Sequence, residues 1–172
     1  MVCDYRIGNT TSAERHFMWK LHVALAVGPG DRITRPAATA RVADSVWSRC
    51  RSIEPFAWPN AGVLDVSLVP DDDGTTEFVY LYDLAEGRMG MRTVDGASIE
   101  CRFDTDVFPC CCYFASYGGM HGAVTSVLEP CTTMPVSVND AAANGFCSRL
   151  EPGEELVTTV TWTIDERSTG SE

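Results

Sequence analysis

The sequence predicts an all-β fold, an antiparallel β-sandwich, and three observations indicate it. The apolar runs are short, about five to eight residues, and rich in Val, Thr, Phe, Tyr and Trp, the residues that strands favour. Turn signals separate these runs roughly every ten residues. No long helical period, heptad or internal repeat occurs. This spacing is typical of sandwiches and barrels.

The first three expected strands differ in the clarity of their pattern. Residues 17–27 place Trp19, Leu21 and Val23 on one face, followed by Leu25, which is the alternation of a strand. Residues 33–42 are a weaker candidate because Pro36 interrupts them. Residues 63–69 alternate as well.

The middle strands carry stronger signals. Residues 77–82 are aromatic and β-branched. Residues 89–93 and 98–103 flank Asp95-Gly96, a dipeptide that favours a hairpin turn. Residues 110–116 form the next expected strand.

Two further strands and two short segments complete the expected elements. The strands cover residues 123–128 and 156–164. Residues 40–51 are compatible with a short amphipathic turn. Residues 139–144 are compatible with a single helical turn that Gly145 ends.

The chain of 172 residues fits one domain. We expect a lead-in at 1–14, a β-sandwich domain at 15–165 and a frayed polar tail at 166–172. The net charge of −11 argues against nucleic acid and against anionic membrane, since both attract clustered positive charge. No apolar run of about eighteen residues and no convincing secretory segment occurs, so we expect a cytoplasmic protein.

The eight cysteines are expected to be reduced thiols rather than a disulfide framework, because no secretory segment accompanies them. Cys110, Cys111 and Cys112 are consecutive, so on a strand they point to alternating faces and cannot all reach one ion. They are interpreted as small buried hydrophobes. We expect no metal site and no cofactor.

Glu129 is the residue that most invites a chemical interpretation. It directly follows the apolar strand 123–128, and Pro130 is expected to stop that strand, which places the carboxylate at a rim. A partly buried carboxylate there is suited to be a general base. The alternative is that it satisfies loop amides or an arginine.

The segment around Glu129 resembles a known family. The run of Glu129-Pro130, Thr132, Pro135 and Leu150-x-Pro152-Gly153-Glu154 before the last strand is similar to the C-terminal part of the galactose mutarotase-like (aldose 1-epimerase) superfamily. Residues 21–34 and 55–60 are similar to its mid-chain strands and the following loop. The resemblance implies a partial β-supersandwich, a sugar site on one concave sheet face and Glu129 at the position of the general base.

Four further side chains are candidate sugar contacts: Trp58, Asn60, Tyr117 and His121. Sugar sites use aromatic faces against the ring and planar polar groups for hydroxyls. Core packing is the alternative for Trp58, and loop hydrogen bonding is the alternative for Asn60 and His121. No histidine stands at residues 55–60, where the resemblance places the family's acid, and only His121 is a candidate for that role.

These observations leave three hypotheses. The first is a carbohydrate-binding protein for a neutral sugar, which the missing acid favours. The second is an active aldose 1-epimerase-like enzyme with Glu129 as general base. The third is a half-domain that needs a partner chain, or a homodimer mate, to cover an exposed sheet.

Overall fold

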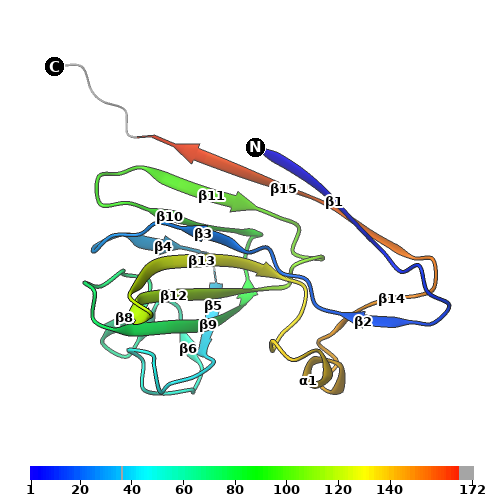
Figure 1. Ribbon diagram of the computed structural model, residues 1–172, viewed down its shortest axis with the longest axis horizontal. Coiled ribbons are helices and arrows are strands. Elements are labelled where there is room, and N and C mark those ends of the chain that lie inside the picture. The colour runs from blue at the N-terminus through cyan, green and yellow to red at the C-terminus, as the bar shows by residue number, and fades with distance from the viewer. Residues whose placement is uncertain (36, 167–172) are drawn as a thin grey trace.

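The computed structural model describes residues 1–35 and 37–166 and contains two large antiparallel sheets stacked on each other (Figure 1). Two small two-stranded sheets and one short helix complete the described part. The predicted all-β antiparallel fold is therefore confirmed.

The first large sheet has five strands. In spatial order they are β1 (Val2–Gly8), β15 (Glu155–Asp165), β11 (Ser98–Arg102), β10 (Arg88–Arg92) and β4 (Arg32–Thr34). Strand β1 pairs with β15 along its whole length, and Val2 lies opposite Thr161. The sandwich therefore begins before residue 15, and β1 is part of it instead of a lead-in. Most of the expected tail, residues 167–172, lies outside the described residues.

The second large sheet has six strands. In spatial order they are β3 (Val23–Leu25), β13 (Ala123–Cys131), β12 (Cys110–Met120), β9 (Thr75–Leu84), β5 (Ala37–Val42) and β6 (Phe56–Ala57). The small elements are β2 (Arg15–Phe17) with β14 (Ser148–Leu150), β7 (Asn60–Ala61) with β8 (Leu64–Asp65), and helix α1 (Val138–Ala143).

The main hydrophobic core joins the facing sides of the two large sheets. One sheet contributes Ile33, Met89, Cys101, Val160 and Trp162. The other contributes Val79, Leu81, Cys111, Tyr113 and Leu128. Since side chains alternate along a strand, the neighbouring residues of these strands point to the opposite side of each sheet. We call the side of the six-stranded sheet that faces away from this core its outer face.

Several expected elements differ from the structure. The strand expected at 17–27 is divided into β2 and β3, and the strand expected at 33–42 into β4 and β5; Pro36 lies outside the described residues. The prediction of a strand at 63–69 is wrong, because only the short strand β8 forms there. The Asp65 carboxylate instead accepts hydrogen bonds from the amide and the hydroxyl of Ser67. Such local bonds compete with strand pairing. Residues 40–51 contain no α-helix. The helical turn predicted at 139–144 is confirmed as α1.

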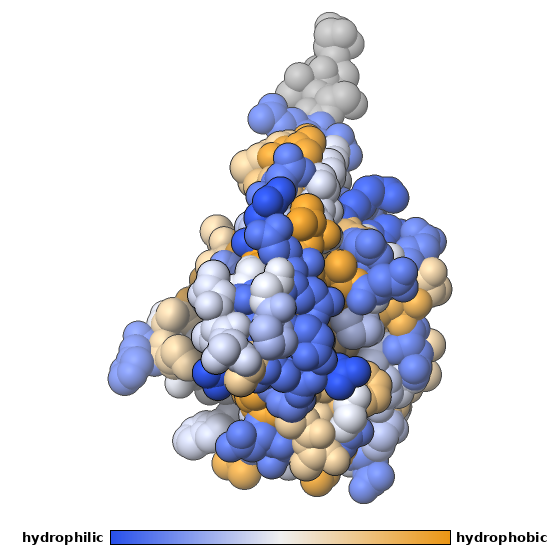
Figure 2. All heavy atoms as spheres, turned by 90° about the vertical axis from the view of Figure 1, so that its right-hand side faces the viewer, coloured by the Kyte–Doolittle hydropathy of each residue, from blue (hydrophilic) through white to orange (hydrophobic). Residues whose placement is uncertain are grey.

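The surface is predominantly polar where β2 and β14 lie. Figure 2 shows this end of the molecule mainly hydrophilic, with apolar side chains in separate patches. No helix of the described residues is long and apolar enough to cross a membrane.

Candidate functional site

Glu129 lies inside strand β13, not at its end. It pairs with Cys112, and Pro130 continues the ladder opposite Cys111. The expectation that Pro130 stops the strand is wrong. The Pro130 carbonyl accepts a hydrogen bond from the Leu21 amide, N to O 3.1 Å, so this residue extends the sheet with its acceptor alone.

The Glu129 carboxylate is buried on the outer face, where the side chains of Lys20 and His22 reach it. Its exposure is 4%. Lys20 Nζ lies 2.7 Å from Oε2, and His22 Nε2 lies 3.5 Å from Oε1. Leu128, the preceding residue, points into the core as expected. The carboxylate thus satisfies a lysine in this structure, whereas an arginine or loop amides were the expected partners.

Strand register explains why these three residues meet. Leu128 pairs with Val23, and Lys20 forms an isolated bridge with Cys131. Lys20 and His22 are two residues apart and therefore lie on one side of their segment. That side is the outer face, so both reach Glu129.

Lys20 is held in its charged state by this environment. Burial lowers the pKa of Lys20, but the nearby Cys112 sulfur, the hydrogen bond to Glu129 and Cys131 raise it more, so the net shift is upward. The Lys20 ammonium also lies 5.0 Å from the centroid of the Phe78 ring. A cation over an aromatic face adds to the attraction.

The outer face continues from Glu129 to Tyr80 on β9, with a hollow beside the Tyr80 ring. Tyr80 pairs with Cys112, which pairs with Glu129, so the three residues lie in line on adjacent strands. Two strand spacings separate Tyr80 and Glu129, which is roughly 10 Å. The Arg41 guanidinium lies 5.5 Å from the Tyr80 ring centroid. A pocket of about 270 Å³ opens there, lined among others by Arg41, Tyr80 and Pro135.

The other sequence-predicted residues do not join Glu129. Tyr117 is fully buried on the core side, where its hydroxyl bonds that of Tyr113. Trp58 packs edge-on against Tyr113, with ring centroids 6.3 Å apart. Asn60 is exposed on β7. Tyr117 therefore lies in the core, and the partly buried Trp58 packs against it, which agrees with core packing as the alternative for Trp58.

His121 lies in the turn between β12 and β13, with φ of 52°. Glu129 is six residues beyond Ala123, the first residue of β13, which separates the two side chains by roughly 20 Å along the strand. His121 therefore cannot act together with Glu129. His22 is the histidine that sequence reasoning missed.

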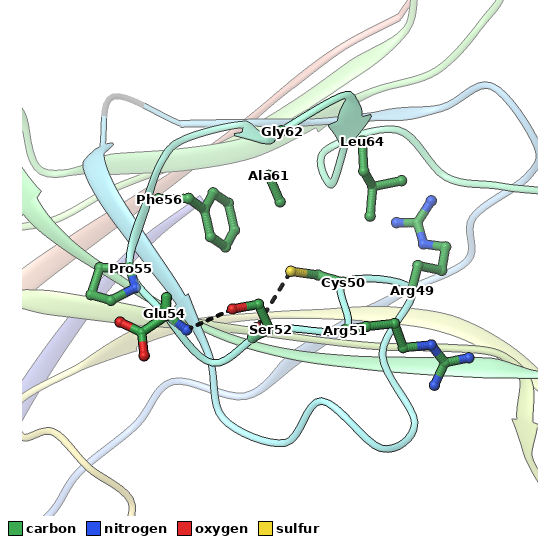
Figure 3. A pocket seen from close by; sticks show the side chains of 10 residues that line it. All are labelled: Arg49, Cys50, Arg51, Ser52, Glu54, Pro55, Phe56, Ala61, Gly62 and Leu64. Carbon is green, nitrogen blue, oxygen red and sulfur yellow. Dashed lines mark hydrogen bonds between the residues drawn. The ribbon is translucent and has the colours of Figure 1, made fainter.

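A larger pocket lies elsewhere. It has a volume of about 540 Å³, and Figure 3 shows Phe56, Ala61 and Leu64 on one side of it and the segment 49–54 on the other. Its cations are already engaged: Arg49 bonds the Glu77 carboxylate and Arg51 bonds the Val46 carbonyl. Glu54, the one carboxylate of its lining, is exposed. We therefore place the candidate site at Glu129.

Three potential metal ligands also meet at Glu129. The ligand atoms of Cys112, Glu129 and Cys131 all lie within 4.8 Å of one another. Cys111 points to the core, so the predicted alternation of the three consecutive cysteines is confirmed. Cys131 comes from the neighbouring strand, a pairing that the sequence spacing does not reveal. All eight cysteines are free thiols in the structure, as expected.

Comparison with solved structures identifies the fold, although no family and no curated protein matches the sequence. A Klebsiella pneumoniae protein provisionally assigned as an aldose 1-epimerase has a TM-score of 0.72 at 13% identity, over 95% of this chain and 42% of that one. An Escherichia coli protein with the same provisional assignment has a TM-score of 0.71 at 16% identity, over 95% and 55%. A galactose mutarotase-like protein from Lactobacillus casei has a TM-score of 0.63 at 15% identity, over 95% and 58%.

The chain therefore has the galactose mutarotase-like fold, which the sequence resemblance predicted. It spans about half the length of these solved structures.

Proposed function

We propose that this protein binds a neutral sugar on the outer face of the six-stranded sheet and interconverts its anomers, with Glu129 as base and His22 as acid. The observation that carries the proposal is the 3.5 Å separation of Glu129 Oε1 and His22 Nε2. His22 supplies the acid that was missing from the sequence analysis, which favoured binding alone.

The geometry suits the chemistry of anomer exchange. A base takes the proton of the anomeric hydroxyl while an acid protonates the ring oxygen, and the ring bond to the anomeric carbon breaks. The open-chain aldehyde then turns and closes from its other face, with the protons returned. Both reacting oxygens are bonded to one carbon, so the acid and the base must lie within a few ångströms of each other. Glu129 and His22 meet this requirement.

The surroundings supply sugar contacts of the usual kind. The aromatic rings of Phe78 and Tyr80 lie on the same face as Glu129, and Arg41 offers a planar set of donors beside the hollow. Aromatic faces pack against the apolar side of a sugar ring, and planar polar groups bind its hydroxyls. The galactose mutarotase-like fold also supports a sugar as the ligand class.

Polarimetry with freshly dissolved α-D-galactose, repeated with other aldoses, tests the proposal. The wild-type protein should raise the rate of mutarotation above the buffer rate. Glu129→Gln and His22→Gln should each lower it by roughly 10²–10⁴-fold, the usual contribution of one acid–base group. His121→Gln, a histidine at the far end of the strand, serves as the control and should leave the rate unchanged.

Binding without turnover is the second candidate function, and the same material distinguishes it. A wild type that shows no rate above buffer, yet binds an aldose in calorimetry, would replace the enzyme by a carbohydrate-binding protein. In that case Glu129→Gln should weaken binding by about 1–3 kcal/mol at most, since the amide retains one hydrogen-bond acceptor.

A further inference from the structure

We infer that Cys112, Glu129 and Cys131 form a binding site for a soft divalent cation such as Zn²⁺, with His22 or water as the fourth ligand. Their ligand atoms lie within 4.8 Å of one another. Two thiolates and a carboxylate are ligands that Zn²⁺ accepts, and the sulfurs favour it over Mg²⁺ or Ca²⁺.

The two sulfurs already have almost the separation that zinc requires. Cys112 Sγ and Cys131 Sγ lie 3.5 Å apart. Two thiolates bound tetrahedrally at the usual Zn–S distance would lie about 3.8 Å apart. Only a small adjustment of the side chains is needed.

The strand pairing holds these groups in place. Cys112 lies directly opposite Glu129, and Cys131 is two residues farther along β13 on the same face. All three residues are buried, and both strands are in the interior of the six-stranded sheet. Side chains on paired strands are positioned more rigidly than side chains on loops, which favours a defined metal geometry.

His22 is placed to complete the coordination. A nitrogen and an oxygen bound to one tetrahedral zinc lie about 3.3 Å apart. His22 Nε2 and Glu129 Oε1 are 3.5 Å apart, and 67% of the His22 side chain is exposed. The imidazole therefore has room to turn, and its side of the cluster gives a metal access from solvent.

The Lys20 ammonium occupies the position beside Glu129 that a bound metal ion would take. Its nitrogen lies 2.7 Å from Glu129 Oε2, so a metal ion that binds this carboxylate must displace it. In the exchange two Zn–S bonds form, two thiol protons pass to solvent, and Lys20 moves outward with its charge retained. The metal ion and the Lys20 ammonium compete for one position beside Glu129. Because metal binding releases thiol protons, the affinity for the metal should fall as the pH falls.

Titration of the reduced 172-residue chain with Co²⁺, followed by displacement with Zn²⁺, tests this site. Thiolate ligands give Co²⁺ an intense charge-transfer absorption, which should appear at one equivalent and disappear as Zn²⁺ replaces Co²⁺. Cys112→Ala should lower the affinity by more than the roughly 10–100-fold that loss of an outer-shell partner costs. Cys111→Ala is the matched control, since this cysteine is adjacent on the same strand but faces the core, and it should bind as the wild type does.

Lys20→Met should raise the affinity for Co²⁺ and Zn²⁺ at least several-fold, a gain that misfolding does not mimic. Absence of the thiolate band in the wild type, or equal affinity of the wild type and the Cys112→Ala variant, would overturn the inference. A bound metal ion would occupy the carboxylate and imidazole that the proposed mutarotase uses as base and acid, so Zn²⁺ should inhibit any mutarotation. The readout is metal binding, so failure of the sugar experiments leaves the metal site intact.

Discussion

At the scale of single residues, the ion pair of Arg49 and Glu77 is buried, and its stability depends on both partners. Glu77 is fully buried, and its Oε1 lies 2.8 Å from Arg49 Nε. The Ser48 hydroxyl donates to the other carboxylate oxygen, and the Arg49 guanidinium lies 5.2 Å from the Tyr117 ring centroid. Removal of one partner would leave an uncompensated charge in a medium of low polarity.

We expect Arg49→Met to lower the free energy of unfolding by about 3–5 kcal/mol, because Glu77 then lacks its cation. Urea denaturation followed by fluorescence measures the change. The double variant Arg49→Met/Glu77→Leu should recover a large part of the loss. The exposed Arg92→Met is the control, and a loss as large in that variant would show that the ion pair is not the cause.

The buried thiols should make the protein sensitive to alkali. Burial raises the pKa of Cys101 and of Cys111 from 9.0 to about 12. Between these values the unfolded chain loses thiol protons that the folded chain keeps, so the free energy of unfolding falls as the pH rises above about 9. Urea denaturation under reducing conditions at several pH values measures this slope. Cys111→Ala should make the decrease of unfolding free energy with pH smaller. An unchanged decrease in this variant would contradict the role of the Cys111 thiol.

The site could be predicted from sequence only in part. Glu129 follows an apolar strand and matches a family pattern, which are local signals. Its partners depend on which strand lies beside β13, and no local signal contains that information. The alternation of Trp19, Leu21 and Val23 implies that Lys20 and His22 lie on the opposite side of their segment, although the sequence analysis did not use this. The pairing of β3 with β13 was the missing step.

At the scale of elements, strand β10 shows how closely strands approach one another. Gly90 lies between β4 and β11, opposite Thr34 on one side and Glu100 on the other. A Cβ atom at Gly90 would lie 2.2 Å from the Ile99 carbonyl oxygen, which belongs to the backbone and cannot move aside. The sheet therefore requires glycine at this position.

Gly90→Ala should destabilise the protein by roughly 1–3 kcal/mol, the usual cost of excess volume in a packed region. Gly8→Ala in β1 is the matched strand control, since its Cβ would meet the Glu155 side chain at an ordinary 3.5 Å. Thermal unfolding of both variants measures the difference. Equal melting temperatures would contradict the steric argument.

Elements with strong local signals were predicted well. The hairpin of β10 and β11 was expected from Asp95-Gly96, and its pairing is confirmed. The strand at 63–69 failed because the Asp65 side chain binds the backbone of its own segment, an interaction that alternation alone does not reveal. Strand β1 was missed, although Cys3, Tyr5 and Ile7 alternate with Asp4 and Arg6 in the sequence, and the three are less exposed than their neighbours in the structure.

At the scale of the whole molecule, each large sheet ends in an edge strand on both sides. Strand β1 is one edge of the five-stranded sheet (Figure 1). The side chain of Val2 on this strand is exposed. The unpaired N–H and C=O groups of an edge strand favour pairing with another chain. We propose that a second copy or another partner covers such an edge.

Light scattering on the full chain should therefore report a dimer or a larger species whose share rises with concentration. Dilution should shift the population toward monomer, since the edge contact is reversible. A single monomeric species at high micromolar concentration would contradict the proposal of self-association and leave a different partner as the remaining possibility.

The pairing of β1 with β15 has a consequence for the order of folding. Val2 meets Thr161, so the two strands join segments from opposite ends of the described chain. During synthesis, β1 has no partner until the ribosome has released β15, whereas β3, β5, β9, β12 and β13 can already assemble. Closure of such a long loop is entropically slow, which favours late completion of the five-stranded sheet. Until then the backbone groups of β1 lack their partners on β15 and are accessible to a chaperone or to a neighbouring nascent chain.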